Sequence, residues 1–101
     1  MAKLGDLVEK IRSKNAGPFW LTVDIFCGSD AVYERLVQGL FTTQLAAVFE
    51  TDVGAIKRFD IADLQVVKFS LKRPQVQGSV ADRDMHGSSW AALVSDIKLI
   101  D

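Results

Sequence analysis

Two polar segments of the sequence, residues 12–18 and 72–87, contain side chains suited to binding a small anion. Arginine offers a planar fork that grips a carboxylate or phosphate through two hydrogen bonds, and lysine adds a mobile point charge. Backbone N–H groups around Gly17 and Gly78 could close on the same anion. We expect ligand contacts from eight residues: Arg12, Ser13, Lys14, Asn15, Arg73, Gln77, Asp82 and Arg83. The competing interpretation is that these are solvated loop charges and ion pairs, because surface loops are normally polar.

The single histidine, His86, gives the second segment a candidate for acid–base chemistry. Imidazole titrates near neutral pH and therefore suits proton transfer, and Asp82 or Asp84 could orient the ring. We predict His86 and Asp84 as the candidate catalytic pair. Alternatively, Asp84 pairs with Arg83 or caps the helix that follows, and His86 only bonds a backbone carbonyl.

The sequence predicts neither a metal site nor a cofactor. Asp82, Asp84 and His86 could hold a hard divalent cation, but alternate loop residues with an intervening arginine are a weak signature. The residue spacings of P-loops, dinucleotide-binding loops and zinc sites do not occur, and no Ser/His/Asp or Cys/His set is recognisable. Cys27 falls on the apolar side of a strand pattern, where it should be a small buried hydrophobe rather than a thiolate.

The composition is that of one domain, residues 1–101, with enough apolar side chains for one two-layer core. The net charge of −1 leaves no excess of Lys and Arg to neutralise a phosphate backbone, so nucleic acid is not an expected partner. No window reaches the apolar length of a membrane span, and the N-terminal residues do not resemble a signal peptide. The cytoplasm is therefore the expected compartment.

Hydrophobic periodicity predicts the elements that position these segments. In chain order we expect a helix or strand over 3–11, a strand over 19–27, two helices between 30 and 52, a hairpin of strands over 55–60 and 65–73, a helix after residue 88 or 89, and a strand over 97–100. Ser29 is placed to cap the first of the two helices, and Thr42 or Thr43 the second. In the hairpin, Phe59 and Phe69 are predicted to point inward.

This order of elements is the split βαββαβ, or ferredoxin-like, order of an α+β fold, with an extra N-terminal element. The fold places helices on one face of an antiparallel sheet. Its first and third strands are antiparallel neighbours, so the start of one lies beside the end of the other. We therefore expect residues 12–18 and 72–87 to meet at one end of the sheet.

The sheet face without helices is predicted to carry Trp20, Phe26, Leu64 and Val66 among polar residues. An apolar open face of this kind usually pairs with another subunit or is covered by an extra element of the same chain, here residues 3–11. We expect a dimer or a hetero-complex formed through this face.

The polar segments also carry a family resemblance. The runs IRSKNAGPF at 11–19, RPQVQGS at 73–79 and DRDMHG at 82–87 resemble a small bacterial family of unknown function, typically encoded beside acyclic terpene utilisation (AtuA) proteins. The chain is also similar to the C-terminal ferredoxin-like domain of the longer AtuA proteins, in which a related loop precedes the first strand. Arg12 to Asn15 occupy the position of that loop.

The resemblance implies an accessory domain or small subunit that acts with an AtuA-like partner on terpene-derived or related carboxylic acids or their acyl-CoA esters. The residues leave two alternatives open. One is a small stand-alone lyase, hydratase or isomerase that uses His86 as acid and base. The other is a ligand-sensing module that needs no catalysis.

Overall fold

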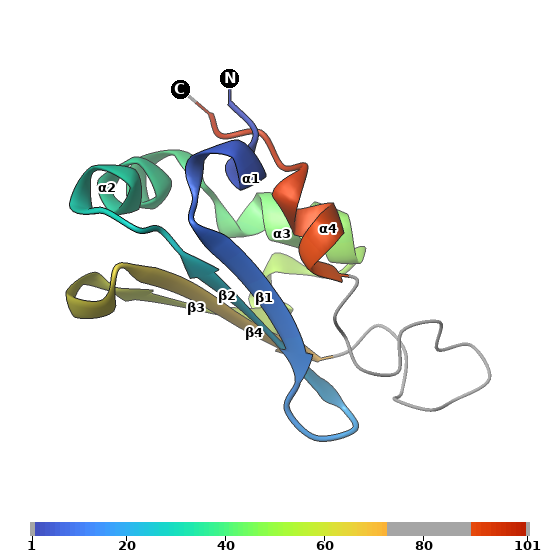
Figure 1. Ribbon diagram of the computed structural model, residues 1–101. Coiled ribbons are helices and arrows are strands. Elements are labelled where there is room, and N and C mark those ends of the chain that lie inside the picture. The colour runs from blue at the N-terminus through green and yellow to red at the C-terminus, as the bar shows by residue number, and fades with distance from the viewer. Residues whose placement is uncertain (1, 73–89, 101) are drawn as a thin grey trace.

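A computed structural model describes residues 2–72 and 90–100 of the chain (Figure 1). The helices are α1 (Leu4–Leu7), α2 (Asp30–Gly39), α3 (Thr42–Phe49) and α4 (Trp90–Ser95), with 3-10 turns η1 (Val53–Ala55) and η2 (Ala62–Leu64). The strands are β1 (Lys10–Asn15), β2 (Trp20–Phe26), β3 (Ile56–Ile61) and β4 (Val66–Lys72). No helix within these residues is long and apolar enough to cross a membrane.

The four strands form one antiparallel sheet in the order β1-β2-β4-β3. All four helices lie on the same side of this sheet, so the molecule has two layers, and the opposite side of the sheet is the open face (Figure 1). This arrangement confirms the predicted α+β class with helices on one face of an antiparallel sheet.

The ferredoxin-like order is not confirmed in detail, because the two ends of the chain differ from the prediction. Residues 10–15 form the edge strand β1 rather than a loop, and they pair with β2 from Lys10 opposite Phe26 to Asn15 opposite Leu21. Residues 97–100 form no regular strand; they make an isolated bridge between Lys3 and Lys98. Backbone hydrogen bonds from Leu4 to Ile97 and from Leu99 to Ala2 hold this segment against the N-terminus.

The core lies between the sheet and the helices. Its central side chains come from alternate positions of β2 and β4, as period-two spacing requires, and from the inner faces of the helices. They include Leu21, Val23, Ile25, Val67, Phe69, Leu71, Leu36, Leu45 and Phe49, all at most 2% exposed. The rings of Phe49 and Trp90 lie 4.9 Å apart and join α3 to α4.

Two predictions about helix starts have different outcomes. Ser29 caps α2 as predicted, since its Oγ accepts a hydrogen bond from the Val32 N–H. The prediction for α3 is wrong, because the N-cap is Phe41 and both candidate threonines lie inside the helix. Gln44 replaces the hydroxyl cap: its Oε1 accepts from the Phe41 N–H, and its Nε2 donates to the Lys98 carbonyl.

Candidate anion-binding surface

The register of the sheet defines which side chains share the open face. Residues directly opposite each other in antiparallel strands point to the same side. Reading across β1, β2, β4 and β3, the open face contains three rows, which are Lys14–Thr22–Ser70–Lys57, Arg12–Asp24–Lys68–Phe59 and Lys10–Phe26–Val66–Ile61. Trp20 and Lys72 lie opposite each other beyond the first row. We call this set the cationic face.

Positive charge is concentrated on the cationic face. It carries six of the twelve Lys and Arg residues of a chain whose net charge is −1, and Asp24 is the single acidic residue in its rows. Within the described residues, none of these six cations is paired with a carboxylate. Their mutual repulsion favours the arrival of a negatively charged group.

Thr22 lies at the centre of the first row and is buried, with 8% of its surface exposed. Its Oγ1 has no hydrogen-bond partner within the described part of the chain. A buried polar group in that state costs about 1–3 kcal/mol. A ligand oxygen that accepts a hydrogen bond from this hydroxyl would remove the cost.

The first row suits an anion better than the other two. Ser70 lies beside Thr22 on β4, and Lys14 and Lys57 lie at the two ends of the row. Neighbouring strands are about 4.8 Å apart, so two hydroxyls sit side by side between two long, flexible cationic side chains. This set supplies neutral and charge-assisted hydrogen bonds to one group of oxygens.

Asp24 restricts where the anion can lie. It occupies the second row between Arg12 and Lys68, and its Oδ1 is also buried without a hydrogen-bond partner among the described residues. An anion placed over this carboxylate would meet like charge in a partly desolvated position. An anion would therefore fit best on the first row, toward Lys72 and Trp20.

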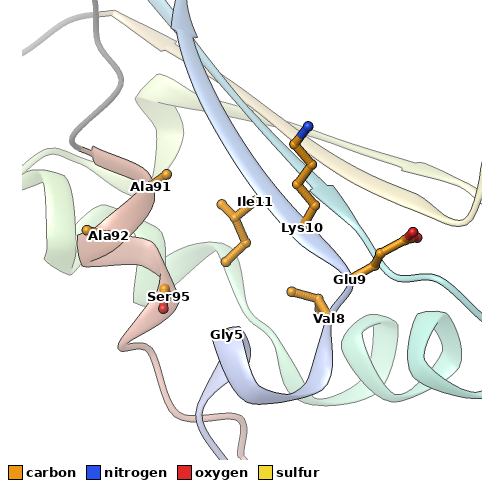
Figure 2. Close-up of a pocket in the computed structure, with 8 residues that line it drawn as sticks. All are labelled: Gly5, Val8, Glu9, Lys10, Ile11, Ala91, Ala92 and Ser95. Atoms are coloured by element: carbon orange, nitrogen blue, oxygen red, sulfur yellow. The ribbon is translucent and has the colours of Figure 1, made fainter.

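Two hollows at β1 offer less chemistry than the first row. One of about 240 Å³ is lined by Glu9, Lys10, Arg12 and Phe26 at the far end of the cationic face. Another, of about 320 Å³, lies where β1 meets α1 and α4 (Figure 2). In Figure 2, Ile11 lies between β1 and α4, whereas Lys10 extends away from α4. The second hollow is lined mainly by small or apolar side chains and brings no set of cations together.

The structure separates the four predicted site residues of the first segment. Arg12 and Lys14 are exposed on the cationic face. Ser13 and Asn15 alternate with them and face the helices, and Ser13 is only 8% exposed. The Ser13 Oγ accepts a hydrogen bond from the Ala91 N–H at the start of α4, so it has a structural role.

Residues 12–18 and 72–87 were predicted to meet at one end of the sheet, and the described residues show one place where their ends lie close together. The Ala16 N–H donates to the Trp20 carbonyl, and Trp20 lies opposite Lys72, so the ends of both segments flank Trp20. The other predicted residues, Arg73, Gln77, Asp82, Arg83, Asp84 and His86, lie outside the described residues.

The sequence predicted Lys14 as a site residue but not the other three members of the first row. Thr22 and Ser70 are on the predicted open face but were not assigned to the site, and Lys57 was missed because Phe59 was predicted to point inward. That prediction is wrong: Phe59 is 46% exposed on the open face, and Arg58 points to the helices. Leu64 is in the turn η2 rather than on a strand.

Cys27 has the predicted character. Its side chain is buried, and burial, assisted by the negative charge of Asp60, raises the pKa of the thiol to about 11. The thiolate is therefore a minor species at neutral pH. Among residues 2–72 and 90–100, no three His, Cys, Asp or Glu side chains are grouped so that they could hold a metal ion.

Comparison with known proteins gives a family but no characterised relative. Residues 4–98 match the model of a family described as a domain of unknown function, DUF4387. No curated protein and no solved structure matches the chain.

Proposed function

The chain belongs to the DUF4387 family, and we propose that it is an accessory subunit that binds a small carboxylate or phosphate on its cationic face and presents it to a larger partner. The observation that carries the proposal is the buried Thr22 hydroxyl, which has no partner among the described residues and lies in one row with Lys14, Ser70 and Lys57.

Charge distribution supports a small anion as the ligand. The chain is acidic overall, so its attraction for negative groups is local to the cationic face. Asp24 interrupts the positive charge in the middle of that face and disfavours a continuous phosphate backbone. A single carboxylate or phosphate group fits the first row without meeting this carboxylate.

The open shape of the proposed site supports a ligand site that this chain shares with a partner protein. The first row lies on the surface of the sheet, and Trp20, Phe26 and Phe59 on the same cationic face are not fully covered. Ligand sites normally bury most of the ligand surface. A partner seated over the face would enclose the anion and cover the aromatic rings, so that each protein contributes half of the site.

The partner we propose is an AtuA-like protein, and the ligand a terpene-derived or related carboxylic acid or its acyl-CoA ester. The support is the resemblance of residues 11–19 to the family encoded beside such proteins. Co-expression of the two chains and affinity capture of one should recover the other. If they do not co-purify, the assignment of the partner is wrong, whereas binding of the anion alone is tested separately.

Anion binding is tested by titrating the isolated chain with a short branched carboxylate in one arm and coenzyme A in the other, followed by amide NMR shifts. We expect shifts centred on Thr22 and Ser70 and weaker binding by Lys14→Gln and Lys57→Gln. Lys98→Gln is the matched control, because Lys98 is exposed and outside the three rows of the sheet. Equal affinity in all three variants, or no shift in either arm, would refute the proposal.

A further inference from the structure

The outer side of β3 has no strand beside it in the described part of the chain. There, β3 is an edge of the sheet and pairs only with β4. The Cys27 N–H donates to the Gln65 carbonyl. Along β4, residues that bond to β2 therefore alternate with residues that bond to β3, and Gln65 begins the set that bonds to β2. It follows that Phe59 exchanges backbone bonds with β4, whereas Arg58 and Asp60 direct their N–H and C=O groups outward. No backbone partner on that side occurs among the described residues.

The side chains of this edge are unusual for a strand exposed to water. Phe59 is 46% exposed, and Arg58 and Asp60 lie on the helix side and form an ion pair at 2.9 Å. A hollow of about 570 Å³ is lined by Arg58, Phe59, Asp60, Ile61 and Lys68. Natural proteins usually protect such an edge, because it offers a template for another strand.

We propose that two copies of the chain pair through their β3 strands, antiparallel, about a twofold axis at Phe59. In this register Arg58 of each copy lies opposite Asp60 of the other, and the two pairs exchange four backbone hydrogen bonds. The two Phe59 side chains meet at the axis in a closely spaced pair on the open face. The contact is isologous, because the same strand serves both copies.

Charge selects this register over its neighbours. Backbone hydrogen bonds between the copies form only when residues whose N–H and C=O groups point away from β4 lie opposite each other. The strands can therefore shift only in steps of two residues. A shift in one direction places Arg58 opposite Arg58 of the second copy. A shift in the other direction places Asp60 opposite Asp60 of the second copy. Both alternatives place like charges in direct opposition, which is destabilising. The Phe59-centred register instead produces a ring of four alternating charges.

The dimer joins two sheets edge to edge and leaves both cationic faces open on the same side. It does not rest on the proposed anion binding, because Lys57 is the one member of the first row on β3, and the other three members are on β1, β2 and β4. Loss of the dimer and loss of the anion site can therefore be observed independently.

Cysteine cross-linking tests the register. Directly opposed residues of a closely spaced antiparallel pair have Cα atoms about 4.5 Å apart, within the range that a disulfide bridges. Phe59→Cys should therefore form a covalent dimer under mild oxidation. Lys57→Cys is the matched control, because the two Lys57 positions are about 13 Å apart along the strands in this register. Equal cross-linking of both variants, or none by Phe59→Cys, would refute the register.

Sedimentation at micromolar concentration tests the dimer itself. We expect the unmodified chain to sediment as a dimer and Phe59→Lys as a folded monomer, because two lysines would meet at the axis. Phe19→Lys is the control, since Phe19 is 50% exposed and lies away from β3. A monomeric unmodified chain would overturn the proposal, as would a dimer that persists in Phe59→Lys.

Discussion

The guanidinium carbon of Arg58 lies 5.6 Å from the centroid of the Phe69 ring, on the side of the sheet that the helices cover. The same guanidinium donates hydrogen bonds to the Leu40 and Leu36 carbonyls at the end of α2 and pairs with Asp60. A cation at a helix C-terminus is favoured by the helix dipole. The Arg58 side chain therefore links the end of α2 to the edge strand β3.

Removing the Arg58 side chain should destabilise the fold. We expect Arg58→Ala to lower the free energy of unfolding by about 3 kcal/mol, because it leaves Asp60 and the end of α2 without their partner. Urea unfolding followed by circular dichroism measures the change. Lys57→Ala is the control, and its exposed side chain should change stability by less than about 0.5 kcal/mol. Similar losses in both variants would show that Arg58 has no special role.

Thr22→Val should separate stability from ligand binding. The substitution keeps the shape and removes a buried hydroxyl without a partner in the described structure, so the free energy of unfolding should rise by about 1 kcal/mol. Anion affinity should fall about tenfold, because one hydrogen bond to a charged group is lost. Thermal melting and the anion titration give the two quantities. A variant that is less stable but binds normally would contradict our assignment of this hydroxyl.

Ser13→Ala should have the opposite pattern. Its hydroxyl accepts from the first turn of α4 and faces away from the cationic side, so its loss should cost about 1 kcal/mol of stability. Anion affinity should be unchanged. The same melting and titration experiments apply, and a weaker anion affinity in this variant would support the original prediction that Ser13 contacts the ligand.

Cys27 makes stability depend on pH in the alkaline range. Its pKa is raised in the folded chain from 9.0 to about 11, so the unfolded chain releases the thiol proton first as the pH rises. The stabilising contribution is complete below pH 9 and is lost between pH 9 and about 11. Urea midpoints across this range should fall less steeply in Cys27→Ala. Burial raises the pKa of Tyr33 too, so part of the slope should remain in that variant.

The fold could be predicted where one face of an element is uniformly apolar. Period-two alternation identified β2, and Ser29 followed by a helical stripe identified α2, because both signals are local. β1 was missed because Ile11 is the one aliphatic residue between Lys10 and Asn15. That strand forms because β2 and α4 supply distant contacts, which no local pattern contains.

The site was predictable only in part for a related reason. Arg12 and Lys14 were identified by residue type, but the row that contains Thr22 and Ser70 exists only when the register of three strands is known. Arg58 and Phe59 show the limit most clearly. An exposed aromatic beside an inward arginine reverses the usual hydrophobic pattern, and the end of α2 explains it only after folding.

The hydrogen bond from Leu99 to Ala2 has a practical consequence for protein engineering. The first and last residues that the structure describes lie side by side on the helix side of the molecule, away from the cationic face (Figure 1). A short linker between them should permit circular permutation, with new ends opened at the exposed turn around Gly54. The same geometry would let the domain be inserted into a host protein while its sheet surface remains accessible.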